Sequence, residues 1–157
     1  MIENESVQVD ATIDADLDHV WSVVSDPSMP AAYSEELIGA QWLDDVGVGA
    51  RFVGMNQRGD YEWSTTCTMI EYDPPHAFIY AVEDPDDPVA IWGFRLGQQD
   101  GAVRLTMVAT MGPGESPPRT AASKDPDNAT AIIARRLANW EKNMLATVEG
   151  VKRICEN

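Results

Sequence analysis

The sequence has few of the residues that build metal and disulfide sites. It contains two cysteines, Cys67 and Cys155, and two histidines, His19 and His76. Two cysteines are too few for a disulfide framework, so we expect both to be buried free thiols. No CxxC or HExxH spacing, calcium-binding loop or Ser/His/Asp spacing occurs. We therefore expect no metal and no cofactor.

Long apolar runs and basic residues are also scarce. No stretch approaches the ~20 apolar residues that span a bilayer, and the opening residues MIENESVQVD do not resemble an export signal. We therefore expect a cytoplasmic protein without membrane insertion. The chain has 11 basic and 26 acidic side chains, which gives a net charge of −15. This charge repels phosphate backbones, so we expect no nucleic-acid partner.

Alternation of apolar and polar residues predicts strands along most of the chain. Residues 7–13 alternate in this way, and a short helix is indicated after them by the apolar spacing of LDHVWSVV. Residues 28–37 form a second short helix or an irregular turn. Six further strands are predicted at about 41–44, 50–56, 61–72, 76–84, 89–98 and 102–111. The short turns between them favour antiparallel neighbours.

The pattern changes after residue 111. Residues 112–124 are rich in Gly, Pro and Ser and predict a loop. From Ala129 to Ile154 the apolar residues recur at spacings of three and four, which predicts one amphipathic helix of about 30 residues. Asp125, Pro126 and Asp127 suit its first turn. Length and element order together predict a single domain over residues 1–157.

Glycines at 47, 49, 54 and 59 raise the question of a phosphate-binding loop. Such a loop needs a helix directly after it, and here another alternating strand follows. The glycines instead belong to a hairpin. Pairing it through a turn at 57–60 sets Asn56 opposite Tyr61 and Gly54 opposite Trp63, which leaves room at Gly54 for an indole or a ligand.

This pairing places an aromatic set on one face of the sheet, where the long helix can cover it. The candidate ligand-binding residues on this face and on the helix are Phe52, Asn56, Tyr61, Trp63, Thr65, Phe78, Tyr80, Trp92, Met107, Ile133, Leu137, Trp140 and Met144. The aromatic members are equally typical of a packed core. Polar Asn56, Tyr61, Thr65 and Tyr80, with Asn143, could orient a ligand or polarise a carbonyl. Glu71 is the one carboxylate that could reach the same face.

Four segments resemble the START-like superfamily, also called helix-grip or Bet v 1-like. They are IDADLDHVWSVVSDP (13–27), VGVGARFVGMN (46–56), YEWSTTCTM (61–69), and AIWGFRL with the following Asp100-Gly101. The chain resembles in particular the polyketide cyclase/dehydrase and lipid-transport (SRPBCC) family. This resemblance implies an α+β helix-grip fold, with a seven-stranded antiparallel sheet around the C-terminal helix and two short helices between the first two strands. It also implies a hydrophobic cavity beneath that helix.

Three functions agree with the resemblance. The leading hypothesis is a carrier or sensor that binds a small hydrophobic or aromatic molecule, lipid-like or polyketide-like, in this cavity. The first alternative is a polyketide cyclase or dehydratase that uses the same cavity. The second is a protein-interaction module of the stress-cochaperone kind, which would use outer-face residues such as Val53 and Met55. A homodimer through the outer face is also possible, and the 112–124 loop could gate the cavity.

Overall fold

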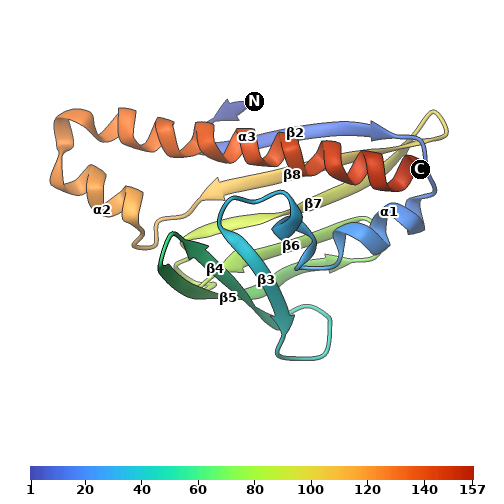
Figure 1. Cartoon of the computed structure of the whole chain (residues 1–157), viewed down its shortest axis with the longest axis horizontal. Coiled ribbons are helices and arrows are strands. Elements are labelled where there is room, and N and C mark those ends of the chain that lie inside the picture. Colours follow the sequence, from blue (N-terminus) through green and yellow to red (C-terminus); the bar gives the residue numbers. More distant parts are fainter.

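The alternating segments form one antiparallel sheet. The computed structural model describes all residues 1–157, and the sheet has eight strands in the order β1-β2-β8-β7-β6-β5-β4-β3 (Figure 1). Their bounds are β1 Ile2–Glu3, β2 Ser6–Ile13, β3 Leu37–Trp42, β4 Arg51–Arg58, β5 Tyr61–Asp73, β6 Ala77–Val82, β7 Ala90–Gln99 and β8 Ala102–Met111. The helix-grip arrangement is confirmed, but the predicted count of seven strands is wrong.

The additional strand, β1, has only two residues, Ile2 and Glu3, too few to show an alternating pattern. Asn4 and Glu5 have positive φ angles of 49° and 61°, which turn the chain back so that Ile2 pairs with Val7. The strand predicted at 41–44 lies at Leu37–Trp42.

Three α-helices and two 3-10 helices complete the secondary structure. They are α1 Leu17–Val24, η1 Met29–Ala32, α2 Pro117–Lys124, η2 Pro126–Asn128 and α3 Ala129–Glu156, where α1, α2 and α3 are α-helical. The short helices between β2 and β3 and the long C-terminal helix agree with the sequence analysis.

The prediction of a loop at 112–124 is correct only for residues 112–116, because Pro117–Lys124 form α2. Ser116 caps this helix by accepting a hydrogen bond from the Arg119 backbone N–H at 3.4 Å, and Pro117 occupies the first turn. Both are ordinary helix-start signals that the surrounding Gly and Pro residues obscured.

The hairpin between β4 and β5 has a tighter turn than predicted. Arg58 pairs with Tyr61, so the turn is only Gly59-Asp60, with Gly59 at φ 63°. Every predicted partner therefore moves by two residues: Asn56 lies opposite Trp63, and Gly54 lies opposite Thr65. The two faces stay as predicted, since side chains alternate with a period of two.

The space predicted beside Gly54 is already filled. A Cβ at Gly54 would lie 3.2 Å from Thr65 Oγ1 and 3.4 Å from Leu37 Cδ1. Further along, a register shift between Met69 and Glu71 turns Tyr72 to the inner face, opposite Phe78. Glu71 is exposed and binds Arg95 through two hydrogen bonds of 2.9 and 2.8 Å. The expectation that Glu71 could reach the inner face is therefore wrong.

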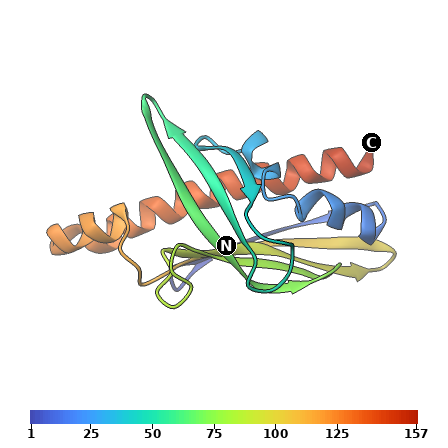
Figure 2. The same ribbon diagram turned by 90° about the horizontal axis from the view of Figure 1, so that it is seen from below.

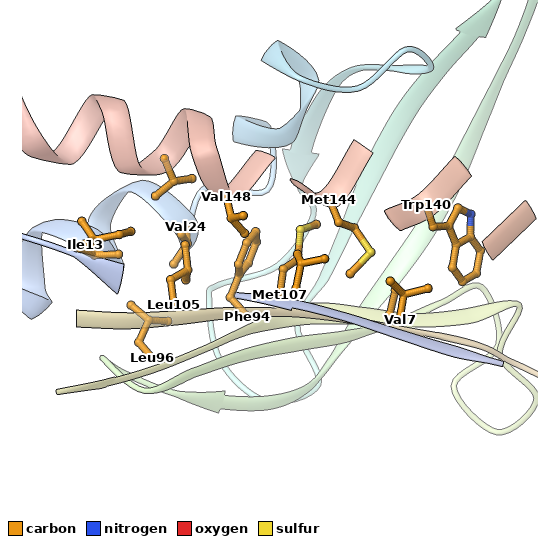
Figure 3. Close-up of a cluster of buried hydrophobic side chains, with 14 of the residues drawn as sticks. Val7, Ile13, Val24, Phe94, Leu96, Leu105, Met107, Trp140, Met144 and Val148 are labelled. Atoms are coloured by element: carbon orange, nitrogen blue, oxygen red, sulfur yellow. The ribbon is translucent and has the colours of Figure 1, made fainter. Parts of the chain in front are cut away.

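The larger hydrophobic cluster lies between α3 and strands β2, β8 and β7. Figure 3 shows Trp140, Met144 and Val148 projecting from α3 toward the sheet, above Val7, Phe94, Leu105 and Met107. The C-terminal end of α3 is also tied to the β2–α1 corner. Lys152 Nζ donates to Thr12 O at 2.5 Å, and the Asp14 N–H donates to a Glu156 carboxylate oxygen at 2.9 Å.

A smaller cluster lies in the part of the sheet that α3 does not cover. Its buried members are Ala50, Phe52, Cys67, Met69 and Phe78. We call β3, β4 and residues 61–69 of β5 the wing. Figure 2 shows its outer end rising away from the rest of the sheet and past α3. None of the helices combines the length and apolar character that crossing a lipid bilayer requires.

Candidate functional site

All the candidate residues on strands lie on the inner face, but they differ in exposure. Tyr61 is the outlier at 68% exposed, because it stands at the hairpin tip beyond α3. The buried candidates are Phe52, Phe78, Met107, Leu137, Trp140 and Met144. The half-buried candidates are Asn56, Trp63, Thr65, Tyr80, Trp92 and Ile133. We call this half-buried set the wing–helix seam.

Beneath the C-terminal half of α3, side chains of helix and sheet meet. Met144 is 1% exposed and Val148 is 0% exposed, within the same cluster as Phe94 and Met107. Two of the seven hollows in the structure lie elsewhere. One is beside α2 and includes Ser116, while the other is on the outer sheet face and includes Arg95 and Arg104. Neither of these two hollows is the cavity expected beneath α3.

An aromatic row crosses the inner face toward α3. The ring centroids of Trp42 and Phe52 are 5.3 Å apart, and those of Phe52 and Tyr80 are 4.9 Å apart. Tyr80 pairs with Trp92 on the neighbouring strand. Trp92 then meets Trp140 of α3 at 4.8 Å. Flat apolar rings thus extend from the wing to the helix, the kind of surface that aromatic and apolar molecules contact favourably.

Polar groups on the seam have few partners within the chain. The Asn56 side-chain amide reaches only the Gly54 carbonyl oxygen, at a long 3.5 Å. No buried side-chain nitrogen or oxygen lacks a hydrogen-bond partner. The Tyr80 phenol is protonated at neutral pH, as a tyrosine ordinarily is, and can donate a hydrogen bond; burial raises its pKa further. Trp63 stacks on Tyr61 with centroids 5.3 Å apart.

The segment between η1 and β3 lies along one flank of α3. The Tyr33 ring occupies the place where a side chain at Gly150 would be, since a Cβ there would lie 2.2 Å from Tyr33 Cζ. Farther along the helix, Glu36 forms ion pairs with Arg136 of α3 at 3.5 Å and with Arg58 of β4 at 4.0 Å. Glu36 therefore connects the helix to the outer end of the wing.

The sequence analysis missed Glu36, Arg58 and Arg136. They come from three elements that are far apart in the chain, and the sequence contains no signal that pairs them. By contrast, Arg51 and Arg95 lie on the outer face of the sheet. Both are bound to exposed carboxylates, Asp44 and Glu71.

The two thiols are placed as expected. Cys67 and Cys155 are both buried and free. Burial raises the pKa of Cys67 to about 12, so it is a neutral thiol and a poor nucleophile at neutral pH. His19 on α1 and His76 are both exposed, and Nδ1 of His76 lies 3.1 Å from the Leu96 carbonyl oxygen.

The fold can now be compared with known families. A family model described as polyketide cyclase / dehydrase and lipid transport matches residues 4–149. The chain belongs to this family. Comparison with curated proteins finds no match.

Several solved structures have the same fold. A Polyketide_cyc-like protein from Corynebacterium glutamicum is 22% identical, with a TM-score of 0.71 over 98% of this chain and 93% of that chain. Major latex-like protein 151 from Panax ginseng is 7% identical, with a TM-score of 0.62 over 97% of each chain. The di-domain ARO/CYC protein StfQ from the steffimycin biosynthetic pathway is 10% identical, with a TM-score of 0.72 over 97% of this chain and 50% of that chain. At these identities the likeness shows the fold.

Proposed function

We propose that this polyketide cyclase/dehydrase and lipid-transport family protein binds a small hydrophobic or aromatic molecule at the wing–helix seam, as a carrier or sensor. The observation that carries the proposal is the half-buried state of inner-face aromatic residues. Trp63, Tyr80 and Trp92 face inward yet stay partly open. Large apolar surfaces left open in this way are often binding sites.

Polar groups within the seam support the same proposal. Asn56, Thr65 and the Tyr80 hydroxyl lie among aromatic rings, and a small-molecule site typically combines an apolar lining with a few orienting polar groups. The ligand enters between the wing and α3, and its rings or chain lie along the row from Phe52 to Trp140.

A neutral fluorescent probe tests this function. N-phenylnaphthylamine brightens in apolar surroundings and should bind at one molecule per chain. Thr65→Phe places a ring on the inner face of β5 and should weaken probe binding about tenfold or more. The matched control is Thr66→Phe, since Thr66 is also half-buried but lies on the opposite face of the same strand.

Thr66→Phe should leave probe affinity unchanged, and both variants should unfold cooperatively. Equal loss in the two variants would indicate a general disturbance of the hairpin and would contradict a site on the inner face. Absence of probe binding to the wild-type chain would contradict the function itself.

A further inference from the structure

Arg136 of α3 is held more loosely than Arg51 and Arg95 of the sheet. Arg51 and Arg95 each bind a carboxylate through two side-chain hydrogen bonds of 2.8–3.2 Å. Arg136 makes one hydrogen bond within the chain, from Nη2 to a Glu36 carboxylate oxygen at 3.5 Å. A guanidinium has five N–H donors, so most of those on Arg136 are free. Its side chain is nevertheless only 33% exposed.

The position of Arg136 on α3 places these donors close to the seam. Side chains three and four residues apart lie on the same face of a helix, so Arg136 neighbours Ile133 and Trp140. Ile133 belongs to the seam, and Trp140 meets Trp92 of the sheet. An anion bound by Arg136 would therefore lie about one helical turn from the aromatic row.

The carboxylate of Glu36 is shared. It lies 3.5 Å from Arg136 and 4.0 Å from Arg58, so two guanidinium groups face one carboxylate. Neither distance is that of a close ion pair. A second carboxylate could bind Arg136 while Glu36 keeps Arg58. The overall charge of −15 repels free anions, so an anion held here would depend on these local donors.

We propose that Arg136 is a specificity-determining residue that binds the anionic head of the ligand, so that the site prefers an amphipathic monocarboxylate to a neutral molecule of the same size. This inference rests on the proposed function and adds the ligand class to it. The apolar part of the ligand lies against Trp92 and Trp140, and Glu36 holds Arg136 in the free protein.

Two fluorescent probes with the same ring system separate the anionic and apolar contributions. Anilinonaphthalene sulfonate carries one negative charge, and N-phenylnaphthylamine carries none. Arg136→Gln should weaken binding of the anionic probe about tenfold or more, because it removes a charged hydrogen bond, and should leave the neutral probe unchanged. Arg135→Gln is the matched control, since Arg135 is exposed at the adjacent position and forms no ion pair. It should change neither affinity.

Two further measurements use the same assay. Glu36→Gln should strengthen binding of the anionic probe, because it removes the competing carboxylate. Dodecanoate should displace the neutral probe from the wild-type chain at lower concentration than dodecanol does, and Arg136→Gln should abolish this difference.

The outcomes separate this inference from the proposed function. If both probes bind but Arg136→Gln affects them equally, or affects neither, the assignment of Arg136 is overturned while the proposed function stands. An effect of Arg135→Gln as large as that of Arg136→Gln would also overturn it, because general charge would then explain the result. If neither probe binds the wild-type chain, both proposals fail.

Discussion

Replacing Gly150 with alanine tests how the segment after η1 is held against α3. An alanine normally stabilises a helix interior by about 1 kcal/mol relative to glycine. Here the added Cβ would lie 2.2 Å from Tyr33 Cζ, 2.3 Å from Cε1 and 2.6 Å from the hydroxyl oxygen. The ring would have to move about 1.2 Å to restore an ordinary contact of 3.4 Å.

Overpacking of this kind costs about 1–3 kcal/mol. We therefore expect Gly150→Ala to lower the free energy of unfolding by about 1–2 kcal/mol, the opposite sign to an ordinary helical site. For a chain of this size, that corresponds to a fall in Tm of about 2–8 °C. Urea denaturation followed by far-UV circular dichroism measures the first quantity, and a thermal melt measures the second.

A double-mutant cycle with Tyr33→Ala identifies the cause. Once the ring is removed, Gly150→Ala should become neutral or stabilising, and the coupling between the two sites should be at least about 1 kcal/mol. The reasoning fails if Gly150→Ala stabilises the wild-type chain, or if it destabilises the Tyr33→Ala chain by the same amount.

Two further predictions concern the sheet. Gly93→Ala should destabilise the chain by about 2–4 kcal/mol, because the added Cβ would lie 2.2 Å from the Phe78 carbonyl oxygen. Gly97 is on the same strand, and a Cβ there would have no atom within 4 Å, so Gly97→Ala should be near neutral in the same denaturation assay. Equal effects of the two variants would contradict this account. Because burial raises the pKa of Cys67 from about 9 to about 12, the folded chain holds this proton more tightly than the unfolded chain. The free energy of unfolding should therefore decline between about pH 9 and pH 12, by up to about 1.4 kcal/mol per pH unit. Cys67→Ala should remove that part of the decline. An identical pH profile in the variant would refute the assignment of the decline to the Cys67 thiol.

The sequence contained enough information to place side chains on faces, but not to fix their partners. The inward positions of Asn56 and Trp63 followed from a period of two, which a turn error of two residues leaves intact. The inward position of Tyr72 depends on an irregularity after Met69 that no residue pattern marks. For the same reason Glu71 was considered for the wrong face.

The site was partly predictable for a related reason. Aromatic residues at alternating positions indicated that the inner face is rich in rings, and Phe52, Tyr80 and Trp92 of that predicted set lie side by side there. Which of them are open depends on where α3 lies across the sheet, a long-range property that local periodicity does not contain. The ion pairs of Glu36 depend on the same packing.

The existence of two hydrophobic clusters has a mechanical consequence. The clusters have in common only two partly buried residues, Trp21 and Val82. A bend of the sheet along this boundary would exchange few apolar contacts, while each cluster moved as a rigid unit. We therefore expect that the wing can move relative to α3 at small energetic cost, without repacking of either cluster.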